Sequence, residues 1–182
     1  MATAEAEFLM VGHGADCRRI AYICEPGQGA AAGGPGVMWL PGFKSEMTST
    51  KVSALAEWAR QRGTAMTRLD YSGHGMSEGR VEDGSIGRWL EEVRSVFTGK
   101  TSGEYVIVGS SMGGYLALLL VRALMEEAPE EARRIKGLVL IAPAWDMTER
   151  LMWARFPESV RREVLETGVF CGHPAMAMAP IP

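Results

Sequence analysis

Short apolar runs alternate along the chain with segments whose apolar residues recur at helical spacing. The apolar runs predict strands at residues 8–11, 19–24, 37–40, 65–69, 105–108 and 137–141. Helical spacing begins at Val52 and again at Ile86, and the apolar stretch 114–121 is a good helix former. Strands that alternate with helices predict an α/β fold with a mainly parallel sheet, whose functional site lies beyond the carboxyl ends of the strands.

The last part of the chain departs from this order. Glycines predict where the first two helices end, Gly63 for the first and Gly99 for the second. Residues 147–166 show a further helical and amphipathic pattern, after which all periodicity is lost. The last nine residues contain three prolines, which neither a central strand nor a long helix accepts. We therefore expect one domain over residues 1–170 and an irregular tail at 171–182.

The sequence G-x-S-x-G, centred on Ser111, is the most informative motif. A β-branched run precedes it and an apolar helix former follows it, which is the strand–turn–helix context of a nucleophile elbow. Such a turn holds its serine in a strained conformation at a helix N-terminus, where negative charge is favoured. Gly109 and Gly113 are expected because a Cβ at either position would clash as strand and helix close up. The alternative is a Gly/Ser-rich turn that merely joins a strand to a helix.

A serine that transfers acyl groups needs hydrogen-bond donors for the developing oxyanion. One is the backbone N–H of the residue after the nucleophile, which is Met112 here. The other comes from the loop after the third strand, at residues 40–45, where Gly42 lets the backbone approach the substrate and Phe43 supplies the N–H. The alternative for this loop is an ordinary tight turn before a helix.

No catalytic acid or base can be assigned. His74 precedes Ser111, whereas this arrangement places its acid and its histidine after the serine, so we expect a tight turn with a locally hydrogen-bonded imidazole. His13, which lies between two early predicted strands, is a weaker candidate for the base than His74. Asp146 and His173 follow in the right order, but no strand precedes the histidine. We therefore expect Asp146 to cap a helix and His173 to be exposed to solvent.

Aromatic and methionine side chains gather just after the sixth predicted strand. Trp145, Met152 and Trp153 belong to a segment, residues 145–166, that is suited to a lid over an acyl chain, because such side chains adapt to varied apolar ligands. The alternative is ordinary helix packing against the sheet.

Composition narrows the partners and the compartment. The net charge is −3 with no basic stripe, so nothing suggests a nucleic acid, and no apolar run reaches membrane-spanning length. The first residues lack the patterns of a signal or transit peptide, and a cytoplasmic location is expected. Cys17, Cys24 and Cys171 form no metal-binding spacing and no disulfide framework, which predicts reduced thiols and no metal.

Four blocks of sequence together resemble the α/β-hydrolase superfamily. They are residues 39–47 with Lys51, 68–77, 109–115 and 138–146. Within the superfamily the chain is similar to the abhydrolase-domain palmitoyl-protein thioesterases, which also act as acyl-glucuronide esterases. The resemblance covers residues 8–170 and implies Ser111 as the nucleophile, with Phe43 and Met112 as the oxyanion donors.

The chain departs from this family at its end. The family continues with two more strands and their helices, and its catalytic aspartate and histidine follow those strands. Because the sequence stops before either, neither residue can be carried over. The expected fold is therefore an α/β-hydrolase lacking its last two strands and helices, that is, a C-terminally incomplete one.

The expected activity is hydrolysis of a carboxylic ester or thioester, on a small molecule or an acylated protein, through an acyl-Ser111 intermediate. A cofactor is not expected, because a serine, a base and oxyanion donors suffice for acyl transfer. A dehalogenase or epoxide hydrolase is disfavoured, since each needs a carboxylate where Ser111 stands. The alternative is an inactive fragment or pseudoenzyme that serves as an interaction domain. With either function, the absence of a seventh strand would make the strand at 137–141 an exposed apolar edge open to self-association.

Overall fold

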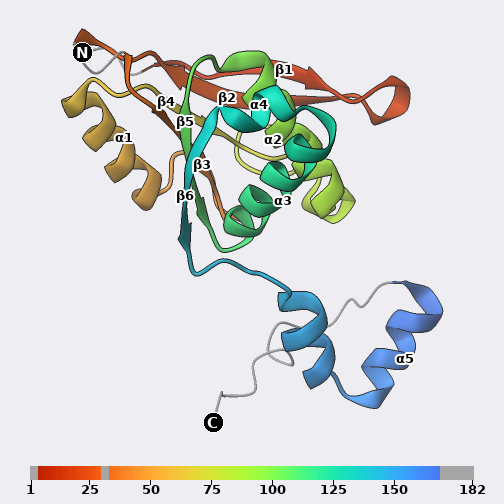
Figure 1. The fold of residues 1–182 in the computed structure, drawn as a ribbon. Helices are drawn as coiled ribbons and strands as arrows, with labels where there is room; N and C mark the ends of the chain where they lie inside the picture. The colour runs from red at the N-terminus through yellow and green to blue at the C-terminus, as the bar shows by residue number, and fades with distance from the viewer. Residues whose placement is uncertain (1–3, 30–32, 169–182) are drawn as a thin grey trace. The chain divides into compact units, whose positions relative to one another are not determined.

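The computed structural model describes residues 4–29 and 33–168, which divide along the chain after Ala144 into two compact units. The first unit alternates strands and helices (Figure 1). Its elements are β1 (Glu7–Val11), β2 (Arg18–Glu25), β3 (Gly36–Leu40), α1 (Thr50–Arg62), β4 (Met66–Leu69), α2 (Ile86–Lys100), β5 (Tyr105–Ser110), α3 (Met112–Glu127), α4 (Pro129–Arg133) and β6 (Ile135–Ile141). Each of the six predicted strands is therefore present, within two residues of its expected limits.

The strands form one sheet in the order β1-β2-β4-β3-β5-β6. The pairs β1–β2 and β2–β4 are antiparallel, whereas β3 runs parallel to both β4 and β5, and β5 runs parallel to β6. The expected mainly parallel α/β sheet is confirmed. Parallel strands end at the same edge, so the loops after β3, β4 and β5 come together there.

Helices cover both faces of the sheet (Figure 1). On one face α2 and α3 pack against a large core that includes Phe97, Ile107 and Leu116, all fully buried. On the other face α1 buries Val52, Ala56 and Ala59 in a smaller cluster. Covering both faces explains why the central strands read as continuous apolar runs instead of alternating ones.

Two predicted helix ends have different outcomes. Gly63 does end α1, in a left-handed conformation with φ 66°, and its N–H bonds to the carbonyls of the last turn. The prediction for Gly99 is wrong, because α2 continues through it to Lys100. The hydroxyl of Thr101 donates to Phe97 O at 2.5 Å and takes over the closing role that was expected of the glycine.

The second unit begins at Trp145, and its described part, residues 145–168, contains three short helices instead of the continuous one expected at 147–166. They are a π-helical turn (Met147–Met152), a 3-10 turn (Trp153–Arg155) and α5 (Glu158–Thr167). The pattern missed the break at Phe156, whose backbone is extended because Pro157 follows it. The predicted tail at 171–182 lies outside the described residues. Among the described helices, none combines the length and the apolar character needed to cross a membrane.

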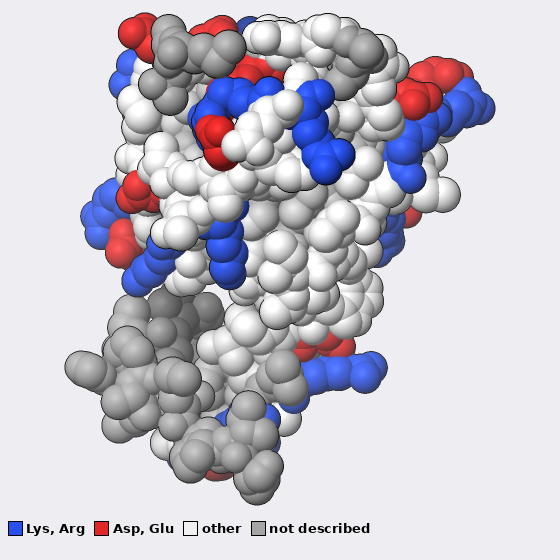
Figure 2. Space-filling model, turned by 90° about the vertical axis from the view of Figure 1, so that its left-hand side faces the viewer, with Lys and Arg blue, Asp and Glu red and all other residues white. Residues whose placement is uncertain are grey.

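Strand β6 borders only β5 within the described sheet, so its other edge is unpaired. Val139 and Ile141 on this strand are 48% and 39% exposed. Both line an apolar groove of about 690 Å³, together with Val37, Leu55, Trp58 and Val106. The view from the α1 side shows a broad area of uncharged residues (Figure 2). An unpaired apolar edge beside an apolar groove favours association with another chain.

We expect the purified chain to self-associate through β6, and the double substitution of Val139→Lys with Ile141→Lys to return it to a monomer. Charged side chains on an edge strand oppose pairing with a second strand. Size-exclusion chromatography with light scattering measures the mass over a range of concentrations. Met76→Lys, at an exposed residue outside the groove, is the control and should associate like the unmodified chain. A monomer at all concentrations in the unmodified chain would contradict this expectation.

Candidate active site

Ser111 stands alone between the end of β5 and the start of α3. Its backbone has φ 52° and ψ −116°, a conformation that side-chain-bearing residues rarely adopt and that costs about 1–3 kcal/mol. Hydrogen bonds on both sides hold it there: Ser111 N–H donates to Ile141 O at 2.9 Å, and its carbonyl accepts from Gly114 N–H at 3.0 Å. The residue is exposed, whereas the neighbouring Ser110 is buried.

The residues 109–113, here called the serine turn, pack closely because two of them are glycines. A Cβ on Gly109 would lie 2.4 Å from Gly113 O. A Cβ on Gly113 would lie 2.0 Å from Leu40 O and 2.6 Å from Pro41 O. These contacts are with backbone atoms, which cannot turn away as a side chain would. Strand β5, helix α3 and the end of β3 therefore meet at a distance that only glycine allows.

The residues 41–49, here called the β3–α1 loop, run against this turn. A Cβ on Gly42 would lie 3.3 Å from Ser110 O and 3.4 Å from Ser111 Cβ. Within the described residues, Phe43 N–H has no hydrogen-bond acceptor. Met112 N–H also lacks one there, because the first N–H of a helix has no partner inside the helix. The loop and the helix thus leave two backbone donors available near the serine.

A cavity of about 370 Å³ adjoins Ser111. Its lining combines the hydroxyl-bearing Ser45, Ser49 and Thr50 with Trp39 and the charged Lys51. A site of this kind can accommodate a polar group close to the serine hydroxyl. The groove beside β6 shares Trp39 and Lys51 with this cavity, so polar and apolar surfaces adjoin.

Residues 70–77, here called the histidine turn, follow β4 and carry three buried polar side chains, those of Asp70, Ser72 and His74. Burial raises the pKa of the Asp70 carboxyl, against the effect of the N–H groups of Met76 and Met47, which donate to it at 2.9 and 2.6 Å. His74 is 5% exposed, with Nδ1 3.1 Å from Ser72 O. The expected local hydrogen bonding of this histidine is therefore observed.

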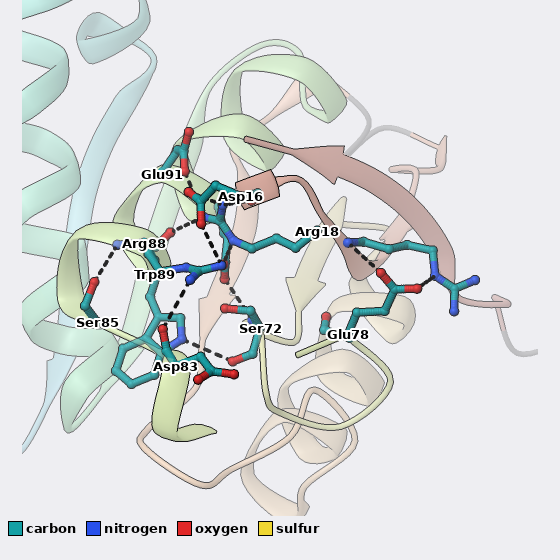
Figure 3. Close-up of polar contacts among 12 residues, drawn as sticks. Asp16, Arg18, Ser72, Glu78, Asp83, Ser85, Arg88, Trp89 and Glu91 are labelled. Carbon is teal, nitrogen blue, oxygen red and sulfur yellow. Dashed lines mark hydrogen bonds and ion pairs between the residues drawn. The ribbon is translucent and has the colours of Figure 1, made fainter. Parts of the chain in front are cut away.

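A buried ion pair between Arg18 and Glu92 is hydrogen-bonded to the backbone of the histidine turn. Arg18 Nε lies 2.5 Å from a carboxylate oxygen of Glu92, whose other oxygen accepts from Ser72 N–H at 2.9 Å. Burial alone would lower the pKa of the Arg18 guanidinium, but hydrogen bonds to Glu92 and Glu91 raise it above its ordinary value. Trp89 Nε1 donates to Ser72 O at 3.2 Å (Figure 3).

This network was not anticipated from the sequence, although a signal for it exists. Glu92 falls on the apolar stripe of α2, at helical spacing with Trp89, Val93 and Val96, and it is fully buried. A carboxylate inside an apolar stripe requires a buried partner, because an unpaired charge there would be very unfavourable. Arg18, at the start of β2, provides that partner.

The remaining candidates belong to the second unit or lie beyond the description. Asp146 occupies the N-cap position of the π-helical turn, but its carboxylate pairs with Arg150 at 2.6 Å and caps no N–H. His173 lies outside the described residues. Trp145, Met152 and Trp153 are in the second unit, where Trp145 is 61% exposed and Trp153 packs edge-on against Phe156. The lid over an acyl chain stays a prediction.

Two of the three cysteines lie within the described residues. Cys17 and Cys24 are free thiols, and burial raises the pKa of Cys24. Cys171 lies outside the described residues. Over residues 4–29 and 33–168, no three His, Cys, Asp or Glu side chains are grouped so that they could hold a metal ion.

Comparison with known proteins gives the family. The profile of a hydrolase family described as serine aminopeptidase, S33, matches residues 36–168, which is most of the chain. The chain belongs to this hydrolase family. The match includes β3, the histidine turn, the serine turn and β6, so Phe43, Ser111 and Met112 all lie within it.

Relatives with known names agree with this assignment. Human palmitoyl-protein thioesterase ABHD10, mitochondrial, is 32% identical over 136 residues, covering 75% of this chain and 42% of the relative. The mouse palmitoyl-protein thioesterase of the same name is 38% identical over 112 residues, covering 62% of this chain and 35% of the relative. The chain thus spans less than half the length of these curated relatives.

Solved structures give the fold class. A putative hydrolase from Agrobacterium vitis S4 superimposes with a TM-score of 0.81 at 37% identity, covering 93% of this chain and 64% of that one. Mouse alpha/beta hydrolase domain-containing protein 10 superimposes with a TM-score of 0.72 at 29% identity, covering 91% and 60%. The expected α/β-hydrolase fold is confirmed, as is the similarity to abhydrolase-domain thioesterases.

Proposed function

We propose that this hydrolase cleaves carboxylic esters or thioesters through an acyl intermediate on Ser111. The observation that carries the proposal is the exposed Ser111 in a strained strand–helix turn, next to two backbone N–H groups that find no acceptor in the described part of the chain. This is the arrangement of a nucleophile elbow with its oxyanion donors. The membership of the chain in a serine hydrolase family supports the same assignment.

In the proposed reaction, Ser111 Oγ attacks the carbonyl carbon of the substrate and loses its proton to water, because no side chain is assigned as the general base. The carbonyl oxygen becomes an oxyanion, which the N–H groups of Phe43 and Met112 stabilise. The intermediate collapses, the C–O or C–S bond breaks, and an alcohol or thiol leaves with a proton. Water then attacks the acyl-serine and releases a carboxylic acid. His74 is unsuited as the base, because both of its ring nitrogens are engaged.

A thioester of a fatty acid is the substrate that we favour. The curated relatives are named palmitoyl-protein thioesterases, and Trp145, Met152 and Trp153 would suit a lid over an apolar acyl chain. The substrate can be a small molecule or an acylated protein. The sequence favours the cytoplasm for this chain, whereas the names of the curated relatives place those proteins in mitochondria; the cytoplasm stays our proposal.

An inactive interaction domain is the second candidate. The unpaired edge of β6 and the apolar groove beside it favour this alternative, since both are features of surfaces that bind other chains. The two proposals differ in one measurable property, which is whether Ser111 becomes acylated.

Mass spectrometry tests the acyl intermediate directly. We expect incubation with p-nitrophenyl butyrate, or with a palmitoyl thioester of N-acetylcysteamine, to add one acyl group to the tryptic peptide of residues 101–122. Without an assigned base, acylation relies on the oxyanion donors and binding, which alone give about 10³-fold over water in triad-deleted proteases. Fragmentation should place the group on Ser111. A chain that releases no nitrophenol and carries no adduct would favour the interaction domain instead.

A further inference from the structure

Hydrogen bonds from the histidine turn hold the β3–α1 loop in place. Three hydrogen bonds join them: Tyr71 Oη donates to Pro41 O at 3.0 Å, Lys44 N–H donates to His74 Nε2 at 3.0 Å, and Met47 N–H donates to the Asp70 carboxylate at 2.6 Å. The donors and acceptors on the loop lie on both sides of Phe43. The loop therefore receives its shape largely from side chains of another loop.

The bond to His74 lies closest to the proposed oxyanion donor. Lys44 follows Phe43 directly, and its φ of 55° places it in the left-handed region that residues with a Cβ rarely adopt. Ser45 N–H donates to Gly42 O at 3.1 Å and closes the turn around both residues. Holding Lys44 N–H therefore fixes the peptide plane next to Phe43, and with it the direction in which Phe43 N–H points.

His74 is itself held in one orientation. Its Nδ1 lies 3.1 Å from Ser72 O. The same carbonyl accepts a hydrogen bond from Trp89 Nε1 (Figure 3). Since Nε2 accepts a hydrogen bond from a backbone N–H, the ring proton must be on Nδ1, which makes the imidazole neutral. The ring also packs edge-on against Phe43, with centroids 5.9 Å apart, and against Trp89 at 5.5 Å.

We propose that His74 is a positioning residue: by accepting from Lys44 N–H, it aims Phe43 N–H at the oxyanion of the acyl-transfer step. The expected effect of His74 on the rate rests on the proposed function of Ser111. The hydrogen bond from Lys44 N–H to His74 can be measured without any activity. His74 acts through the loop and takes no part in proton transfer. The buried Arg18–Glu92 pair fixes Ser72 and so completes the support of the imidazole.

Two substitutions separate this role from packing alone. His74→Gln keeps an acceptor oxygen at a similar reach, whereas His74→Met fills similar space without a comparable acceptor. We expect His74→Met to slow acylation by p-nitrophenyl butyrate by about 10²-fold, which is the effect of losing or misplacing one oxyanion donor, with little change in KM. His74→Gln should recover most of the rate. Amide hydrogen exchange at Lys44 should accelerate in His74→Met and stay slow in His74→Gln.

Ser77→Ala is the matched control within the same turn. Ser77 Oγ donates to Asp70 O and accepts from Ala21 N–H, so its hydrogen bonds go to residues other than Lys44. This variant should lower the melting temperature but leave Lys44 exchange slow. Equal Lys44 exchange in the unmodified chain and His74→Met would overturn the proposal, as would a His74→Gln variant that acylates no faster than His74→Met. If the unmodified chain does not acylate at all, the proposed function fails while the exchange data still decide the role of His74.

Discussion

Ser111→Ala should remove all labelling of the protein by a fluorophosphonate probe. Such probes react with an activated serine hydroxyl, and the proposed nucleophile Ser111 is exposed and lies beside two backbone N–H groups that have no acceptor among the described residues. Alanine keeps the same backbone preferences, so the strained conformation and the fold should persist. Labelling is measured by gel fluorescence, and circular dichroism shows whether the variant is folded.

Ser110→Ala provides the control for this experiment. The two serines are adjacent, but Ser110 is only 7% exposed and lies at the end of β5. Its variant should still be labelled, and the label should map to Ser111. A Ser111→Ala protein that remains labelled would show that another nucleophile reacts, and the proposed function would have to be abandoned.

The part of the fold that depends on local pattern was predictable. Each strand follows from an apolar run, and Gly63 ends α1 because only a residue without a Cβ adopts its φ cheaply. Predictions of where helices end or break failed where a residue other than the expected one ends or interrupts the helix. Thr101 closes α2, so Gly99 did not have to, and Pro157 forces its neighbour out of the helical conformation.

The site was predictable to a similar degree. The serine turn is a local motif, so Ser111 and its glycines could be found from spacing alone. The support of the β3–α1 loop could not, because His74, Asp70 and Tyr71 bond to backbone groups that lie 23 or 30 residues earlier in the chain. Because nearly every residue carries the same backbone N–H and C=O groups, the sequence does not show which of them accept or donate such bonds. The histidine could be recognised as locally bonded, but its partner could not be named.

The close packing of Gly113 against β3 affects both the stability of the fold and the placement of the proposed oxyanion donors. We expect Gly113→Ala to abolish cooperative folding, with a loss of more than about 4 kcal/mol in the free energy of unfolding. The added methyl group would lie 2.0 Å from Leu40 O and 2.6 Å from Pro41 O. Relief requires that α3 move away from β3, which would separate Met112 N–H from the β3–α1 loop. Urea unfolding followed by circular dichroism measures the effect.

Gly99→Ala is the matched control, because it makes the same chemical change where space is open. Gly99 lies in α2, is exposed, and has no neighbouring atom within 4 Å of an added Cβ. Alanine there should stabilise the protein by about 0.5–1 kcal/mol, since glycine is the poorer helix former. If Gly113→Ala instead unfolds within 1 kcal/mol of the unmodified chain, the backbone at Leu40 can yield. The close approach of β3 to α3 would then not be what holds the proposed oxyanion donors in place.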